Sequence, residues 1–94
     1  MYLSYTEMKN MIPNIIQGKI LEQETNTPLA NAHIQIMYGE EEVVTNSNGE
    51  FVLRSWQAFP LTLVIEHRQY DTNCINIQKP LSSYIISLKP KSKL

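Results

Sequence analysis

The chain has 94 residues, of which 43% are apolar and 18% charged, and its formal net charge at pH 7 is -1. A chain of this length builds one small domain, and its composition excludes the disordered, collagen-like and membrane-spanning classes. Eight lysines and arginines against nine aspartates and glutamates also exclude the strongly basic surface that binding to a nucleic-acid backbone requires.

Residues 1–13 are predicted to be an appendage in front of the folded domain. A secretory signal needs a continuous apolar run of roughly 7 to 15 residues, and Glu7, Lys9 and Asn10 interrupt any such run here. No stretch of the sequence approaches the roughly 18 consecutive apolar residues of a membrane helix. We therefore expect no export signal and no membrane span in the chain as given, and a cytoplasmic location if the chain is complete.

Alternation of apolar and polar residues from Asn14 onward predicts seven short strands and no helix. Every second side chain of a half-buried strand points to the same face. The predicted strands cover residues 14–20, 32–38, 43–46, 50–56, 61–67, 72–78 and 84–90. The side chains predicted to point inward are Ile16, Ile20, Ala32, Ile34, Ile36, Tyr38, Phe51, Leu53, Leu61, Leu63, Ile65, Ile75, Ile77, Ile86 and Leu88. Turn-forming residues separate the strands at a spacing typical of an antiparallel sandwich or a small barrel.

The predicted domain therefore covers residues 14–90, and residues 91–94 are predicted to be a basic tail. Lys89, Lys91 and Lys93 lie near the end of the chain. Three lysines can approach an anionic lipid surface, but without an apolar anchor they bind it weakly. We expect a solvated terminus instead.

Several spaced motifs resemble the carboxypeptidase regulatory-like domain. That family has a G-x-V strand, a P-L-x-x-A entry to its second strand, a T-[DN]-x-x-G-x-F hairpin and a G-Y pair before its sixth strand. The matching positions are Gly18, Pro28, Leu29, Ala32, Thr45, Asn46, Gly49, Phe51 and Tyr70. Gln69 stands where the family has the glycine of the G-Y pair. A positive φ is not expected there, because a residue other than glycine adopts it at a cost.

This resemblance implies a fold and a general role. The implied fold is all-β, a seven-stranded antiparallel Greek-key sandwich of the transthyretin-like type. Domains of this family are non-catalytic and accompany other units, such as the catalytic domain of zinc carboxypeptidases or the N-terminus of TonB-dependent outer-membrane receptors. The resemblance thus implies an accessory module for protein interaction or structural support, with another protein or a neighbouring domain as partner and the cell envelope as location. It specifies no ligand.

The stretch TNSNG could be part of a calcium loop or the turn of a hairpin. An EF-hand-like loop with Gly49 at its sixth position would place Val44 at the first and Ser55 at the twelfth position, where calcium needs carboxylates. A hairpin turn uses every residue type present. Asn46 and Asn48 can bond to their own backbone, and Gly49 takes a positive φ without strain. We therefore predict a turn and no calcium site.

The other candidate catalytic and metal-binding residues are isolated from one another. His33 and His67 have no carboxylate or thiolate cluster beside them, and Cys74 is the single cysteine on a predicted outward position. This pattern indicates neither a zinc site nor a disulfide nor a cysteine nucleophile. The glutamates at 40–42 imitate paired catalytic carboxylates, but three adjacent acids beside a glycine are typical of a solvated turn. The sequence predicts no catalytic residue, no metal and no cofactor.

A small enzyme of the same architecture is the alternative function. Transthyretin-related hydroxyisourate hydrolases carry a C-terminal Tyr-Arg-Gly-Ser signature together with active-site histidine and arginine residues, whereas this chain ends LKPKSKL. The signature is absent. A pocket in which histidine and arginine side chains converge would favour this alternative.

The segment RSWQAFP places two large aromatic residues, Trp56 and Phe59, between two predicted strands. Aromatic residues at the end of a sandwich can dock a protein or a sugar. They can also plug the open end of the core, which is the interpretation that we favour because a small sandwich needs large apolar residues there. Trp56 and Phe59 are the candidate partner-binding residues. An exposed strand edge is a second route to a partner, by strand addition.

Overall fold

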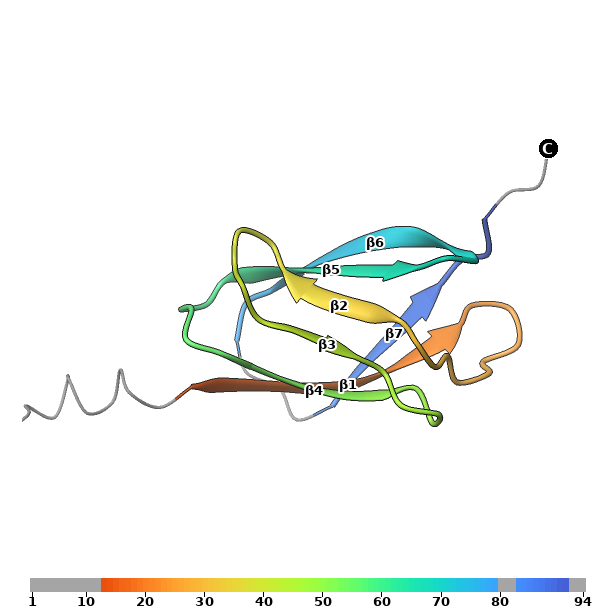
Figure 1. Ribbon diagram of the computed structural model, residues 1–94, viewed down its shortest axis with the longest axis horizontal. Coiled ribbons are helices and arrows are strands. Elements are labelled where there is room, and N and C mark those ends of the chain that lie inside the picture. The colour runs from red at the N-terminus through yellow and green to blue at the C-terminus, as the bar shows by residue number, and fades with distance from the viewer. Residues whose placement is uncertain (1–12, 80–82, 92–94) are drawn as a thin grey trace, which may run out of the picture.

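The computed structural model describes residues 13–79 and 83–91, and its regular structure there consists of seven β-strands (Figure 1). In chain order these are β1 (Asn14–Glu22), β2 (His33–Ile36), β3 (Glu42–Val44), β4 (Glu50–Ser55), β5 (Leu61–His67), β6 (Tyr70–Ile77) and β7 (Tyr84–Leu88). No helix occurs within the two described ranges. The predicted all-β class and each predicted strand are confirmed. Residues 1–12 of the predicted appendage and 92–94 of the predicted tail lie outside the described residues.

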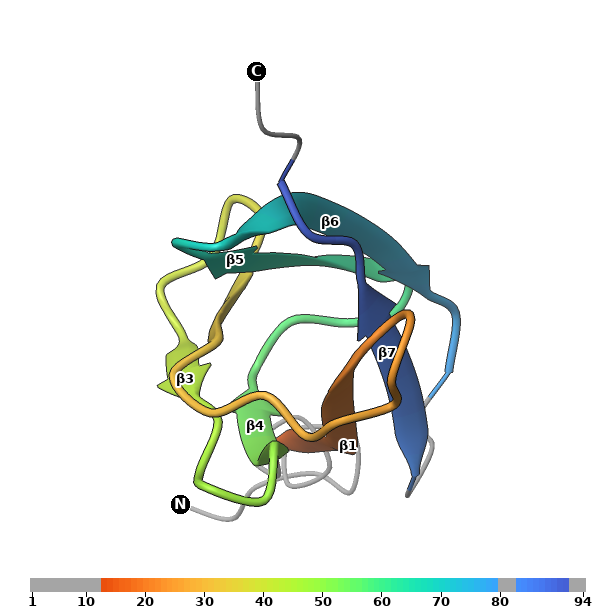
Figure 2. The ribbon, with the colours of Figure 1, turned by 90° about the vertical axis from the view of Figure 1, so that its right-hand side faces the viewer.

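The seven strands form two sheets that face each other as a sandwich (Figure 2). One sheet has the order β4-β1-β7 and the other the order β3-β2-β5-β6. Two pairs of consecutive strands, β2 with β3 and β5 with β6, are antiparallel neighbours. The chain otherwise passes from one sheet to the other, as it does in a Greek key.

One strand pair departs from the predicted antiparallel arrangement. β7 runs parallel to β1, with Ile86 paired to Ile20. β7 follows β6, which belongs to the opposite sheet. A strand that enters a sheet from across the sandwich is not joined to its neighbour by a tight turn, so no hairpin fixes it antiparallel. Alternation within a strand carries no information on strand direction, which is why the sequence does not reveal this pair.

The core lies between the two sheets and is built from alternate residues of the strands. Fourteen apolar side chains are buried there, namely Ile16, Ile20, Leu29, Ala32, Ile34, Ile36, Phe51, Leu53, Leu61, Leu63, Ile65, Ile77, Ile86 and Leu88. All but Leu29 come from the predicted inward set, so the predicted faces are confirmed for these strands. Burial of alternate side chains from both sheets supplies the main free energy that holds the sandwich together.

Tyr38 is the exception among the residues predicted to point inward. Its side chain is 98% exposed, because β2 ends at Ile36 and the chain turns there. The N–H of Gly39 donates to the carbonyl of Ile36 at 2.9 Å, and Tyr38 has a positive φ of 63°. The period of two that governs a strand no longer applies in a turn. The inward prediction for Tyr38 is therefore wrong.

The TNSNG stretch forms the predicted turn between β3 and β4, but the predicted hairpin is wrong, because the two strands belong to different sheets and do not pair. The Asn46 side-chain oxygen accepts hydrogen bonds from the N–H groups of Asn48 and Glu50, both at 2.9 Å. Gly49 has a φ of 74°, and a Cβ at this position would lie 2.6 Å from the carbonyl oxygen of Ile20. Thr45 is buried, and its hydroxyl donates to the carbonyl of Leu29 at 2.7 Å. All these polar groups serve the turn.

Candidate interaction site

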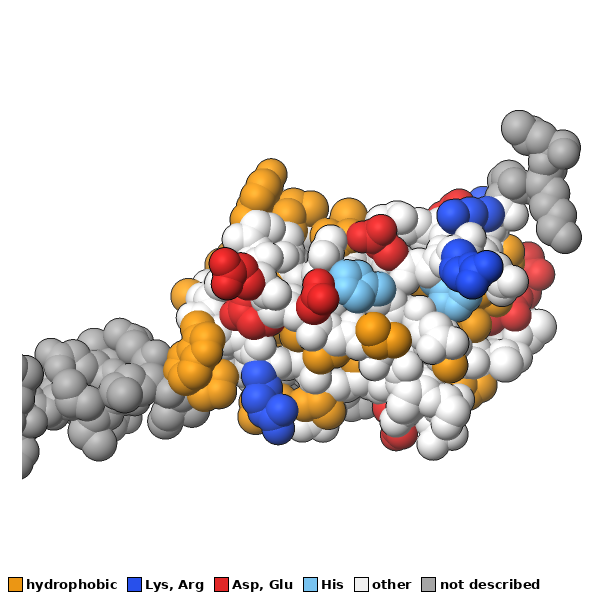
Figure 3. Space-filling view, in the orientation of Figure 1, with side chains coloured by type: hydrophobic (Ala, Val, Ile, Leu, Met, Phe, Trp, Pro, Cys, Tyr) orange, Lys and Arg blue, Asp and Glu red, His pale blue; other side chains and the backbone are white. Residues whose placement is uncertain are grey.

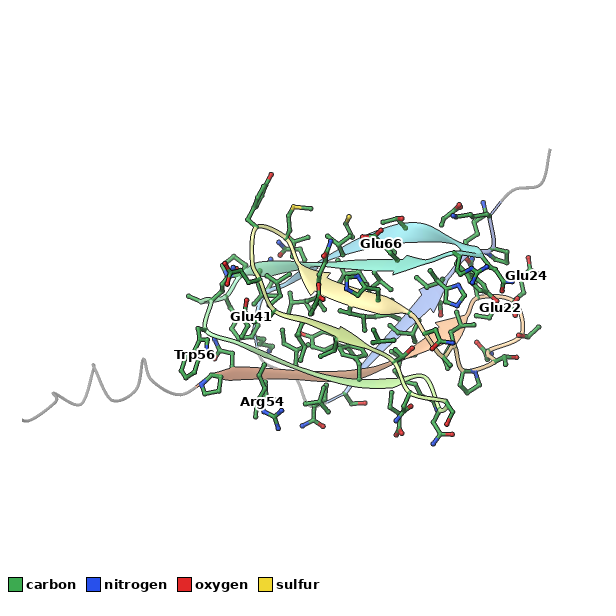
Figure 4. All side chains as sticks on the ribbon, in the orientation of Figure 1. Glu22, Glu24, Glu41, Arg54, Trp56 and Glu66 are labelled. Carbon is green, nitrogen blue, oxygen red and sulfur yellow. The ribbon has the colours of Figure 1, made fainter. Side chains whose placement is uncertain are left out.

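One end of the sandwich brings together the turn between β2 and β3 and the connection between β4 and β5. We call it the tryptophan end, and it comprises Tyr38, Glu41, Trp56, Gln57 and Phe59. Figure 4 shows Trp56 at this extremity, with Glu41 on the neighbouring segment. Both candidate partner-binding residues predicted from the sequence lie here. Tyr38 and Glu41 were not predicted to belong to the site.

The carboxylate of Glu41 fixes the end of β4. Its Oε1 accepts hydrogen bonds from the Ser55 hydroxyl at 3.0 Å and from the Trp56 N–H at 3.1 Å. Its Oε2 accepts from the N–H of Glu40 at 3.1 Å. Ser55 is fully buried, and a buried hydroxyl needs such a partner. The predicted solvated turn is therefore wrong for Glu41, which is half-buried and hydrogen-bonded.

These hydrogen bonds lower the pKa of Glu41 below its ordinary value of 4.5. The N–H of Trp56 contributes most and the N–H of Glu41 itself comes next. Burial opposes them, and the Ser55 hydroxyl and the N–H of Glu40 lower the pKa by smaller amounts. Hydrogen bonds donated to a carboxylate favour its charged form. Glu41 is thus held ionised, and its charge is used to position the backbone of Trp56.

Gln57 ties three further segments to this end. Its N–H donates to the Ser55 hydroxyl at 3.0 Å, and its carbonyl accepts from the side-chain amide of Asn14 at 2.8 Å. Its own side-chain amide donates to the carbonyl of Tyr38 at 3.4 Å. The residues on both sides of Gln57 are therefore held on a backbone that is fixed from β1, β4 and the turn after β2.

Trp56 and Phe59 have different environments. The Trp56 side chain is 63% exposed, whereas Phe59 is half-buried and packs against the core cluster. The plug interpretation fits Phe59 and does not fit Trp56. An exposed tryptophan offers a large apolar surface, and here its backbone is held by hydrogen bonds.

A second candidate surface is a shallow cavity of about 590 Å³ at the edge of the sandwich. It is lined by Gln17, Gly18, Lys19, Val43, Val44, Asn46, Glu50, Phe51, Val52, Ser83 and Ile85. Three apolar residues of this lining are exposed, Val44 to 55%, Val52 to 43% and Ile85 to 64%. The lining therefore combines exposed apolar residues with polar and charged ones, the composition of a small protein-binding surface.

His67 and Arg68 line another shallow cavity with Asn31 and Gln69, which is the pairing that a hydrolase would need. However, both ring nitrogens of His67 already bind the backbone. Nδ1 accepts from the N–H of Gln69 at 3.1 Å, and Nε2 lies 3.2 Å from the carbonyl oxygen of Ala30. This arrangement assigns the proton of the neutral ring to Nε2. His67 holds the turn between β5 and β6, and it has no free nitrogen for acid or base catalysis.

The remaining predicted candidates are dispersed. His33 pairs with Glu42 at 3.2 Å on the outer face of β2 and β3, and Figure 3 shows acidic and histidine side chains together on this side. Cys74 is exposed. In residues 13–79 and 83–91, no group of three or more His, Cys, Asp or Glu side chains is placed to hold a metal ion. The same ranges contain no helix that is long and apolar enough to cross a membrane.

Gln69, which stands where the family has a glycine, does not have a positive φ. Among the described residues, a positive φ occurs at Asn26, Asn31, Tyr38 and Gly49, so the expectation for Gln69 is confirmed. The fold and these motifs agree with a match to the CarboxypepD_reg-like domain model over residues 16–94. The chain belongs to the CarboxypepD_reg-like domain family. The resemblance inferred from the motifs is confirmed.

Solved structures with this fold show how widely it is used. The CarboxypepD_reg-like chain resembles a chain in the crystal structures of two interface mutants of the type II cohesin-X-dockerin complex from Acetivibrio cellulolyticus, with 25% identity and TM-scores of 0.61 and 0.60. The match covers 79% of this chain and 51% of that chain, so this chain corresponds to about half of its neighbour's length. None of the curated proteins compared with it matches.

A third structure shares the fold alone. It is a 9R-lipoxygenase from Cyanothece PCC8801, with 18% identity and a TM-score of 0.56, and the match covers 85% of this chain but 16% of the lipoxygenase chain. The fold therefore occurs both in a protein complex and as a small part of an enzyme, and it does not by itself define a function.

Proposed function

We propose that the chain is a non-catalytic accessory module that contacts another protein, or a neighbouring domain, through the tryptophan end. The observation that carries this proposal is the exposed side chain of Trp56 on a backbone that Glu41 and Gln57 hold in place. Tryptophan is the residue type most enriched among the residues that dominate binding energy at protein interfaces. Tyr38 exposes a second aromatic side chain at the same end.

The anchoring contacts explain why this end suits recognition. Binding costs free energy whenever a surface segment must be ordered. The N–H of Trp56 and the N–H of Gln57 already donate to Glu41 and Ser55, so the backbone beneath the indole ring is ordered before a partner arrives. More of the apolar contact free energy therefore remains as affinity.

The comparisons support an interaction role in general terms. The family is that of a regulatory-like domain, and two of the similar structures come from a complex whose interface was mutated. We extend this to the chain as a module of residues 14–90, with residues 1–13 as an appendage and 91–94 as a basic tail. Placement in the cell envelope is part of the same proposal and rests on the family resemblance.

The experiment that tests the proposal is a Trp56→Ala substitution, read out by thermal unfolding and by photocrosslinking in extracts of the source organism. Because Trp56 is exposed, we expect a change in unfolding free energy within about 0.5 kcal/mol, as for other surface substitutions. A photoreactive residue at position 56 should give a discrete crosslinked product.

A matched control carries the same photoreactive residue at Thr72, an exposed position on β6. The product from position 56 should be absent from the control. An excess of the unlabelled wild-type chain should compete and remove the product, whereas an excess of the unlabelled Trp56→Ala chain should not. The same product from both positions, or none from position 56, would refute the proposal. A large loss of stability in Trp56→Ala would instead show that the residue is a plug.

A further inference from the structure

The backbone of β4 has an edge that no other strand of the described residues covers. β4 pairs with β1 on one side. The N–H and carbonyl of Glu50 point to the other side, where they bond to the side-chain oxygen and the N–H of Asn46. The Trp56 N–H also points there, towards Glu41. Because backbone groups alternate in direction along a strand, those of Val52 and Arg54 face this same uncovered edge.

The neighbouring edge strand of the other sheet, β3, also has backbone groups that point away from its partner strand. The carbonyl of Glu41 accepts from β2, and both backbone groups of Thr45 bond to residues next to β2. By the same alternation, the backbone groups of Glu42 and Val44 point away from β2. Val43, Val44, Phe51 and Val52 of these two strands line the cavity of about 590 Å³, which also extends over residues 17–19 of β1 and over Ser83 and Ile85.

On the opposite side of the sandwich, main-chain hydrogen bonds join the β6 and β7 segments of the two sheets. The N–H of Asp71 donates to the carbonyl of Lys89 at 2.8 Å, and the N–H of Lys91 donates to the carbonyl of Gln69 at 3.1 Å. Between the β3 and β4 segments, the main-chain hydrogen bonds found within the described residues are those of the turn at Asn46. The two sides of the sandwich therefore differ, and on the β4 edge the N–H and carbonyl groups of Val52 and Arg54 remain for a further strand.

The side chains at this edge select the chemistry of a partner. Val52 and Arg54 both point outward from β4, and Arg54 is exposed with no ion-pair partner among the described residues (Figure 4). A strand added beside β4 would place one residue opposite each of them. Cross-strand neighbours favour an apolar residue opposite valine and an acidic residue opposite arginine.

We propose that β4 accepts an extended peptide segment of another protein by strand addition, with an acidic residue opposite Arg54 and an apolar residue opposite Val52. The segment runs antiparallel to β4, the direction of the better-aligned hydrogen bonds. This inference rests on the proposed interaction role and names a second surface, the edge of β4 at Val52 and Arg54, which adjoins Trp56. Only a polypeptide offers donors and acceptors at the spacing of a strand edge.

The test uses the capped peptide Thr-Thr-Asp-Thr-Val-Thr-Thr and a matched peptide with lysine in place of aspartate. Amide chemical shifts of the labelled full chain report which residues are contacted. We expect saturable shifts centred on Val52 and Arg54, with the aspartate peptide binding about three to ten times more tightly than the lysine peptide, given the strength of cross-strand charge pairs. No saturable shift, or shifts confined to other strands, would overturn the proposal.

Arg54→Glu should reverse the preference between the two peptides, and Arg68→Glu is the control, because Arg68 is an exposed arginine on the turn between β5 and β6. Peptides N-methylated at aspartate and valine should lose binding, since these N–H groups face β4. Equal binding of the methylated peptide would overturn strand addition. Concentration-dependent shifts of the Arg54 amide without peptide would overturn it in favour of a second copy of the chain.

Peptide binding by the wild-type chain and crosslinking through position 56 are separate measurements, and comparing them separates this inference from the proposed function. If the peptide does not bind but position 56 still gives the crosslinked product, only the proposal for the β4 edge is rejected. If the peptide binds but position 56 gives no product, only the proposal for the tryptophan end is rejected.

Discussion

Glu41 and Trp56 are joined by a hydrogen bond of 3.1 Å from the backbone N–H of the tryptophan to the carboxylate of the glutamate. The two residues are fifteen positions apart in the chain, and they adjoin β3 and β4, which belong to different sheets of the sandwich. The same carboxylate oxygen accepts from the buried hydroxyl of Ser55. One side chain thus links the edge of one sheet to the last residue of β4, and the position of the exposed indole ring depends on it.

Glu41→Ala should destabilise the protein by about 1–3 kcal/mol, because the buried Ser55 hydroxyl and the Trp56 N–H lose their acceptor. Urea unfolding measures this change. Glu40→Ala is the matched control, because this substitution removes the same charge from the neighbouring, exposed position. It should alter the unfolding free energy by no more than about 0.5 kcal/mol. Equal effects of the two substitutions would contradict the anchoring role of Glu41.

The stability of the protein should also depend on the ionisation of Glu41. Its pKa in the folded state lies below the ordinary value of 4.5, chiefly because the Trp56 N–H donates to the carboxylate. A lowered pKa stabilises the fold fully above the unfolded-state pKa, and this contribution disappears as pH falls through the folded-state pKa. Unfolding free energies measured between pH 7 and acid should therefore fall more steeply for the wild type than for Glu41→Gln below about pH 4.5. Parallel curves would show that Glu41 does not contribute.

Gly49→Ala should destabilise the turn between β3 and β4. A φ of 74° costs a residue with a Cβ roughly 1–2 kcal/mol, and the added Cβ would lie 2.6 Å from the Ile20 carbonyl oxygen, a backbone atom that cannot move freely. We expect a loss at or above that range in thermal or urea unfolding. Ser47→Ala in the same turn is the control, because Ser47 is exposed, and it should stay near wild type. An unchanged unfolding free energy for Gly49→Ala would mean that the turn relaxes to accommodate the added Cβ.

The sequence predicts most of the fold because period-two burial is a local property. Ile34, Leu63 and Ile65 sit on the predicted face of their strands, and each is fully buried. The same rule fails at Tyr38, where a turn ends the strand. The rule also does not predict the direction of β7 relative to β1, because a parallel and an antiparallel strand bury the same alternate residues.

The candidate site is less predictable because it depends on contacts between distant segments. Trp56 was identified from its residue type, but its exposure follows from how the chain leaves β4. Glu41 looked like a solvated acid, since nothing near it in sequence signals the partners Ser55 and Trp56. A sequence pattern reports faces and turns, whereas a contact across the sandwich requires the folded geometry.

His67 provides the last prediction, because its ring binds the backbone on both sides. Nδ1 accepts from the N–H of Gln69 and Nε2 donates to the carbonyl of Ala30, while the ring meets Tyr70 edge to face at 5.1 Å between centroids. His67→Ala removes these contacts and should destabilise the protein by about 1–3 kcal/mol. His33→Ala, which removes a partly exposed histidine and its contact with Glu42, should cost about 0–1 kcal/mol. Urea unfolding at neutral pH distinguishes the two. A His67→Ala variant as stable as the wild type would contradict the structural role of this ring, and a chemical role for the adjoining cavity would then have to be tested.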